Sequence, residues 1–186
     1  MQNIMYDLTT PQKLIWYTEE VFKGTSIENI TGTVIIPNKV DFSSLEQAIN
    51  FYVQKNDSFR LKFLKQDNQI KQYVETFNEF HVDLAQISSN DDLKRVEEEI
   101  ASTVFDVFNS FLFKFTMLKF PDGHGGFIIN MHHLISDAWS AGIRCIWNYQ
   151  DLYLFIEKWE YWWHYLPFLH RLYKFWTRIY VKSKIW

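Results

Sequence analysis

The feature that most constrains the fold is an alternation between segments with helical periodicity and segments rich in β-branched and aromatic residues. The clearest helix is expected over residues 43–57, where apolar side chains recur at i, i+3, i+4, i+7 and i+8. Ser43 and Glu46 have the spacing of a capping box at its start. Further helices are expected at 8–22, 90–105 and 137–153, and strands at 30–37, 58–65, 69–75, 111–120 and 126–134. This order predicts an α/β or α+β sandwich in which helices cover a sheet.

Finer features of these segments are also predicted. A threonine before Pro11 suits the first turn of the helix at 8–22. The expected inward-facing residues of that helix are Leu14, Ile15 and either Tyr17 or Val21. In the helix at 90–105, Asn90 or Asp91 is expected at the N-cap, and the inward-facing residues are Leu93, Val96, Ile100 and Val104. The residues QDN at 66–68 predict a hairpin turn between two strands.

Composition excludes several classes of protein. A net charge of −3 gives no basic surface for nucleic acid. The single cysteine, Cys145, excludes an internal disulfide and a cysteine-based zinc site. The first residues do not have the pattern of a signal peptide, and the apolar runs are too short to cross a bilayer. A cytoplasmic protein is therefore expected.

The motif that carries potential chemistry is MHHLISDAWS, residues 131–140, which directly follows a strongly apolar run. His132 and His133 could be ordinary residues at a strand end. They could also be metal ligands together with His124 and Asp137, although zinc requires three or four ligands in fixed geometry. In a third interpretation one imidazole acts in acid–base catalysis. Because neighbours in a strand point to opposite faces, one histidine is expected to be chemical and the other structural.

Three blocks together resemble the condensation domains of nonribosomal peptide synthetases, which belong to the superfamily with chloramphenicol acetyltransferase-like folds. HHLISDA is similar to the HHxxxDG motif of that family. The opening LTTPQKLIWY resembles the LTxxQxxxW block, matched by Leu8, Thr9, Gln12 and Trp16. NDSFRLKF resembles the second block, RHExLRTxF, with Arg60 and Phe63 matching and with Asn56 and Ser58 departing from it. The resemblance covers residues 8–153 and implies the N-terminal lobe of a domain with a mixed sheet covered by helices.

The resemblance implies a role for each matched residue. His133 would be the catalytic residue, acting as general base or positioning the amine that attacks an acyl thioester. His132 would support it by packing and hydrogen bonding. Asp137 would be structural and paired with an arginine. Arg60 is the predicted partner within this chain, and the alternative is an arginine in the family's second lobe. Ala138, Trp139 and Ser140 would contact substrate, and Ala138 replaces the usual glycine of the motif.

The same resemblance implies which partners the chain would have. Peptidyl or acyl carrier protein domains would present phosphopantetheine thioesters, and an adenylation domain would load them. No directly bound cofactor, metal or nucleic acid is expected. The family's second lobe, with its DFGWG-like motif, does not occur in the sequence. An inter-lobe face would then be uncovered, and self-association through it is expected.

The tail at 154–186 departs from the family pattern. Residues 150–186 hold 13 of the 35 aromatic residues and carry a net charge of +3. A frameshift in the coding sequence is the hypothesis for this change, and an amphipathic helix at a membrane surface is its alternative. The leading function hypothesis is a truncated condensation domain whose parent forms amide bonds, and there are two alternatives. One is a catalytically inert fragment or interaction module, and the other is a CoA-dependent acyltransferase that shares the HxxxD motif.

Overall fold

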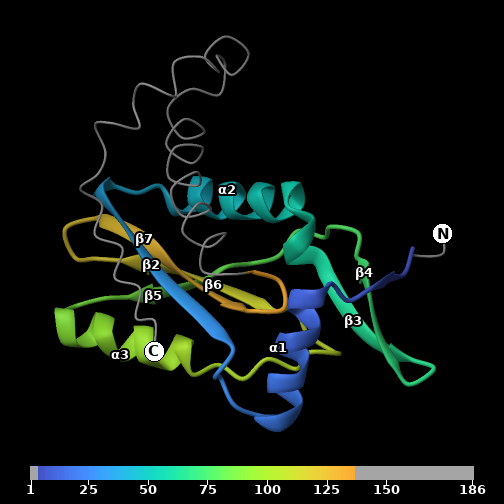
Figure 1. Cartoon of the computed structure of the whole chain (residues 1–186). Coiled ribbons are helices and arrows are strands. Elements are labelled where there is room, and N and C mark those ends of the chain that lie inside the picture. The colour runs from blue at the N-terminus through green and yellow to red at the C-terminus, as the bar shows by residue number, and fades with distance from the viewer. Residues whose placement is uncertain (1–3, 137–186) are drawn as a thin grey trace, which may run out of the picture.

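The computed structural model describes residues 4–136, which form two sheets and three α-helices (Figure 1). The expected helix at 137–153 and the tail at 154–186 lie outside the described residues. In chain order the elements are β1 (Tyr6–Asp7), α1 (Thr10–Val21), β2 (Asn29–Lys39), α2 (Phe42–Lys55), the 3₁₀-helix η1 (Asp57–Arg60), β3 (Leu61–Gln66), β4 (Gln69–Val74), β5 (Asp83–Gln86), α3 (Asn90–Ala101), β6 (Phe113–Lys119) and β7 (His124–His132).

The larger sheet is mixed and has helices on both faces. Its strand order is β2-β7-β6-β5, and only the β5–β6 pair within it is parallel. Figure 1 shows α2 over one face and α3 over the other. Side chains of the central strand β7 alternate between them: Phe127 and Ile129 pack in the cluster that contains α2, whereas Ile128 packs in the cluster that contains α3. Burial on both faces explains why β7 is an almost continuous apolar run. The predicted α/β sandwich with a mixed sheet is confirmed.

The smaller sheet, ordered β1-β4-β3, extends from one end of the larger one (Figure 1). β3 and β4 form a hairpin whose two-residue loop is Asp67 and Asn68, both with positive φ. Aspartate and asparagine tolerate this left-handed conformation, which two-residue hairpin loops need. The predicted turn is confirmed. The predicted strand start at Ser58 is wrong, because η1 precedes β3 and buries Phe59 completely.

Two of the predicted helix starts are corrected. The N-cap of α2 is Asp41, whose side chain accepts the Ser43 N–H, so Ser43 and Glu46 do not form a capping box. Glu46 instead accepts the Val82 N–H at 2.7 Å and ties the segment before β5 to α2. The N-cap of α3 is Ser89, one residue before the predicted Asn90. In both helices the N-cap residue has an extended backbone, and its side chain accepts a hydrogen bond from a backbone N–H of the first turn.

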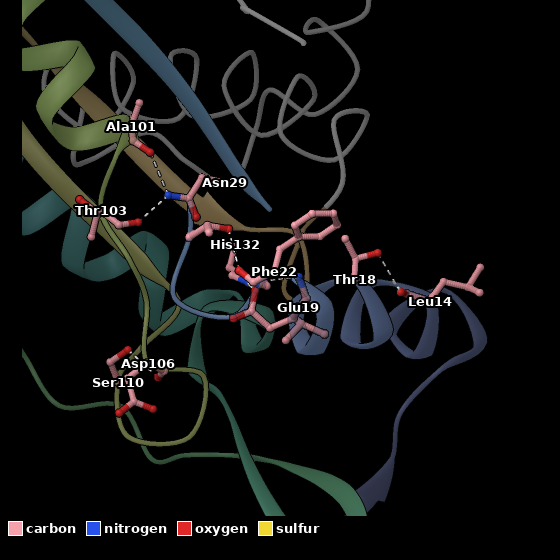
Figure 2. Close-up of polar contacts among 12 residues, drawn as sticks. Leu14, Thr18, Glu19, Phe22, Asn29, Ala101, Thr103, Asp106, Ser110 and His132 are labelled. Atoms are coloured by element: carbon pink, nitrogen blue, oxygen red, sulfur yellow. Dashed lines mark hydrogen bonds and ion pairs between the residues drawn. The ribbon is translucent and has the colours of Figure 1, made fainter. Parts of the chain in front are cut away.

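Two asparagines hold the C-terminal end of α3. The Asn29 amide donates to the carbonyls of Ala101 and Thr103, and Figure 2 shows this fork. The fully buried Asn130 of β7 donates to the Ile100 carbonyl at 2.6 Å. These bonds give further partners to carbonyls at and just after the end of the helix. The helix ends at Ala101, earlier than the predicted 105.

The predicted inward face of α1 is largely wrong. Leu14, Tyr17 and Val21 are 66%, 66% and 74% exposed, and only Ile15 packs against the core. The face that α1 turns inward instead carries Glu19, which is 7% exposed. Within residues 4–136 no helix is both long and apolar enough to cross a membrane.

Candidate functional site

The candidate site begins where β7 ends. His132 is the last residue of the strand, and the chain then turns through His133–Ile135. The turn is closed by the Ile135 N–H, which donates to the His132 carbonyl at 3.1 Å. Because the strand stops between the two histidines, their side chains have different environments.

His132 is a buried, fully hydrogen-bonded residue. It is 3% exposed, and its Nδ1 accepts the Leu134 N–H at 3.1 Å. Its Nε2 lies 3.1 Å from Oε2 of Glu19, which is in the last turn of α1 (Figure 2). An Nδ1 that accepts a hydrogen bond carries no proton, so the proton of the neutral ring is on Nε2 and is donated to Glu19. The ring of Phe105 packs edge-on against the imidazole at 6.5 Å between centroids.

Burial sets the ionisation of this pair. It lowers the pKa of His132 to about 4, and the nearby His133 acts in the same direction, while the Glu28 carboxylate opposes it. Burial also raises the pKa of the Glu19 carboxyl, and the neighbouring Glu20 carboxylate adds to this. A neutral His132 agrees with its geometry, because a proton on Nδ1 would break the bond from Leu134. His132 is therefore not a proton acceptor at neutral pH.

His133 is different in each of these respects. It is partly exposed, and its backbone N–H donates to the Glu28 carbonyl at 2.8 Å. Among residues 4–136, its imidazole has no hydrogen bond or ion pair with another side chain. Its backbone is thus fixed, while the ring keeps both nitrogens free of partners in the described part of the chain.

The four matched residues of the opening block cap α1 and pack it, and one of them contacts this turn. Leu8 is in the core, and Thr9 is the N-cap of α1, where it forms a capping box with Gln12. The Gln12 Nε2 also donates to the Leu134 carbonyl at 3.0 Å. Trp16 packs edge-on against Phe108, on the loop after α3, at 5.5 Å. The expected capped start of this helix is confirmed.

Gln12 also connects the turn to the smaller sheet. The side-chain amides of Gln12 and Gln72 exchange two hydrogen bonds, each 2.9 Å long. Gln72 is a β4 residue, 6% exposed, whose Nε2 donates in addition to the Asp7 carbonyl of β1. The turn after β7, helix α1 and the smaller sheet are therefore joined through two glutamines.

Arg60, the predicted partner of Asp137, lies at the end of η1. Its Nη2 pairs with Asp57, and its Nη1 donates to the Glu75 carbonyl at 3.0 Å. Its buried Nε has no hydrogen-bond partner among residues 4–136. Asp137 lies outside the described residues, so the Arg60–Asp137 pair stays a prediction.

The remaining predicted site residues, Ala138, Trp139 and Ser140, also lie outside the described residues. Of the two other groups considered as metal ligands, His124 is at the start of β7 and pairs with Asp122, at the opposite end of that strand from His133. In the described range, 4–136, no three histidine, cysteine or acidic residues are grouped to hold a metal ion.

Two residues that the sequence reasoning missed are Glu19 and Gln72. Gln12 and Glu19 are seven residues apart and so lie on one face of α1, together with the packed residues Ile15 and Trp16. Two polar residues within an inward-facing stripe were the available signal. For Gln72 no local signal exists, because its partner is 60 residues away in the sequence.

A cavity of about 410 Å³ lies between α1 and the loop after α3. Its walls include Trp16, Glu19, Phe105 and Phe108. Glu19 and Phe105 also contact His132, whereas neither His132 nor His133 lines this cavity.

A mixed sheet between helices, with a partly exposed histidine immediately after the inner strand β7, fits the class of proteins with a chloramphenicol acetyltransferase-like fold. The family model for the condensation domain matches residues 2–157. The chain belongs to the condensation-domain family.

Curated relatives are large peptide synthetases. Surfactin synthase subunit 1 of Bacillus subtilis (strain 168) is 30% identical over 152 residues, which are 77% of this chain and 4% of that protein. Bacitracin synthase 3 of Bacillus licheniformis is 26% identical over 140 residues, 74% of this chain and 2% of that protein. The chain therefore spans only a small part of the relatives that it matches.

Solved structures show the same fold. The starter condensation domain of rhizomide synthetase superposes with a TM-score of 0.69 at 16% identity, covering 82% of this chain and 38% of that one. The first condensation domain of the calcium-dependent antibiotic synthetase, in complex with a substrate analogue, gives 0.70 at 13% identity, with 83% and 39% covered. This partial coverage agrees with the expectation that the chain corresponds to one lobe, the N-terminal one.

Proposed function

We propose that this chain carries the catalytic histidine of a condensation domain that forms amide bonds between thioester-bound substrates. In this reaction the amine of an aminoacyl thioester attacks the carbonyl carbon of an acyl or peptidyl thioester. A C–N bond forms and the C–S bond breaks, while the nitrogen loses one proton and the departing thiolate gains one. The observation that supports the proposal is the placement of His133 directly after β7, with a fixed backbone and an unpaired imidazole among the described residues.

His133 is assigned the role of general base or of a group that positions the attacking amine. His132 supports it structurally, because its ring is buried and both ring nitrogens are engaged. Asp137 and Arg60 are assigned a structural pair, and Ala138, Trp139 and Ser140 contacts to substrate. A thioester is already activated, so holding the two thioesters together supplies much of the rate enhancement.

The partners that follow from this chemistry are carrier protein domains that bear phosphopantetheine thioesters, and an adenylation domain that loads them. The relatives are peptide synthetases, which supports this choice. Self-association through the uncovered inter-lobe face belongs to the same proposal.

The test is a condensation assay with the chain and two carrier proteins, one loaded with an acyl donor and one with an aminoacyl acceptor. We expect amide product from the wild type and a loss of about 10²–10⁴-fold with His133→Ala. His81→Ala is the matched control, because His81 is 81% exposed in its side chain and lies before β5, where it pairs with Glu46. Absence of product from the wild type would instead support the inert fragment.

A further inference from the structure

Both backbone polar groups of Leu134, the residue after His133, have side-chain partners, one on β7 and one on α1. The Leu134 N–H donates to Nδ1 of His132, and the Leu134 carbonyl accepts from Nε2 of Gln12. Leu134 is 2% exposed, so water cannot replace these partners without opening the core. The His133 N–H is fixed by the Glu28 carbonyl. The backbone is thus held on both sides of the His133 side chain.

One of these anchors depends on which nitrogen of His132 carries the proton. Nδ1 can accept the Leu134 N–H only if the proton is on Nε2. The group beside Nε2 is the Glu19 carboxylate, at 3.1 Å, and Glu19 and His132 are both buried. A carboxylate accepts and cannot donate, so it selects the Nε2–H form of the ring. Removing it would leave Nε2–H unsatisfied in a buried site, and the Leu134 N–H alone would then favour that form over Nδ1–H.

We propose that Glu19 is a positioning residue for His133, acting through the tautomer of His132 and the Leu134 amide. The role of His133 in this statement rests on the proposed function, whereas the hydrogen-bonded chain from Glu19 to Leu134 does not. Glu19 is on α1 and His132 is 113 residues later, so the contact also fixes the distance between the helix and the end of β7. Glu20, the next residue, is exposed and makes no contact with His132, so it provides a matched control.

The first arm of the test measures the tautomer in the intact chain by NMR of the imidazole nitrogens. In the wild type we expect His132 to be protonated on Nε2 at pH 7 and the Leu134 amide to exchange slowly with solvent. Finding the Nδ1–H form in the wild type would overturn the proposal without any variant.

The second arm uses three variants. Glu19→Ala is expected to mix the tautomers of His132 and to speed exchange of the Leu134 amide at least tenfold. Glu19→Gln should retain both wild-type properties, because its amide oxygen can still accept from Nε2–H. Glu20→Ala should leave both unchanged. If Glu19→Ala is folded and both the His132 tautomer and the Leu134 amide exchange stay at wild-type values, the proposal is wrong. If Glu19→Ala is unfolded, finding the Nδ1–H form of His132 in Glu19→Gln overturns the proposal equally.

The third arm tests whether the contact between Glu19 and His132 affects the rate of amide formation. In the condensation assay Glu19→Ala should lower kcat at least tenfold with little change in KM for the carrier proteins, and Glu19→Gln should restore most of it. Equal kcat in wild type and Glu19→Ala would contradict a positioning role. A wild type without turnover would count against the proposed function alone, because the NMR arms would still decide the chain from Glu19 to Leu134.

Discussion

At the scale of single residues, two adjacent histidines are separated by the end of one strand. His132 belongs to β7 and points into the interior, where Glu19 and the Leu134 amide occupy both ring nitrogens. His133 begins the turn and is partly exposed. The sequence predicted that the two would differ, because strand neighbours face opposite ways. It could not identify the partner of His132, since Glu19 is 113 residues away.

The ionisation of His132 gives a prediction for stability against pH. Its pKa in the folded chain is about 4, below the 6.5 of an unperturbed histidine. Between these values the unfolded state binds more protons, so the His132 contribution is fully present above pH 6.5 and is lost as the pH falls towards 4. At 1.36 kcal/mol per pKa unit, the contribution is at most about 3 kcal/mol.

His132→Asn is the comparison that isolates this contribution, because asparagine can accept the Leu134 N–H but does not titrate. Chemical denaturation at a series of pH values should show the stability advantage of the wild type shrinking between pH 6.5 and 4. The raised pKa of Glu19 acts in the opposite sense, since its protonation favours the folded state, but both proteins contain Glu19. A constant difference across this range would show that His132 does not titrate below its usual pKa in the folded chain.

At the scale of elements, local patterns predicted the long segments and failed where tertiary contacts decide. Of the apolar residues predicted to face inward from α2, Leu45, Ala48, Ile49 and Val53 are buried and Tyr52 is partly buried, because a single face of the helix meets the sheet. The short strands β1 and β5 were missed, since two and four residues carry too little periodicity. Val104 was assigned to α3, but it follows the helix and is 52% exposed.

The end of α3 gives an element-scale prediction. Asn130 donates to the Ile100 carbonyl, and its Oδ1 accepts the Thr31 hydroxyl at 2.9 Å. Asn130→Ala would leave the carbonyl and the hydroxyl without this partner, at a cost of about 1–3 kcal/mol in unfolding free energy. Amide exchange should rise most in the last turn of α3.

The control for this variant is Asn78→Ala, because Asn78 is exposed and its amide makes only a weak bond of 3.4 Å to the Thr76 carbonyl. A change within about 0.5 kcal/mol is expected for it. If the two variants had equal effects, Asn130 would not be an anchor of α3.

At the scale of the whole molecule, α1 is the element on which the two sheets meet. Its first turn binds β4 through Gln72, and the same Gln12 side chain binds the turn after β7. Its next turns place Trp16 against the loop after α3 and Glu19 against His132. An inward face on which Gln12 and Glu19 lie beside Ile15 and Trp16 explains why hydrophobic periodicity assigned the wrong side of this helix to the core. It also accounts for Gln12 of the LTxxQxxxW block, which donates to the Leu134 carbonyl 122 positions away.

This arrangement predicts that Gln12 and Gln72 act as one unit in stability. Each forms partly buried hydrogen bonds with the other, so either alanine variant leaves an amide without its partner and should cost about 1–3 kcal/mol. The double variant should cost less than the sum, with a coupling energy of about 0.5–3 kcal/mol in urea unfolding. Gln69→Ala, at the exposed start of β4, should stay within about 0.5 kcal/mol and add independently to Gln12→Ala. Strict additivity of Gln12→Ala and Gln72→Ala would mean that the smaller sheet and the His133 turn are stabilised separately, and that α1 does not couple them.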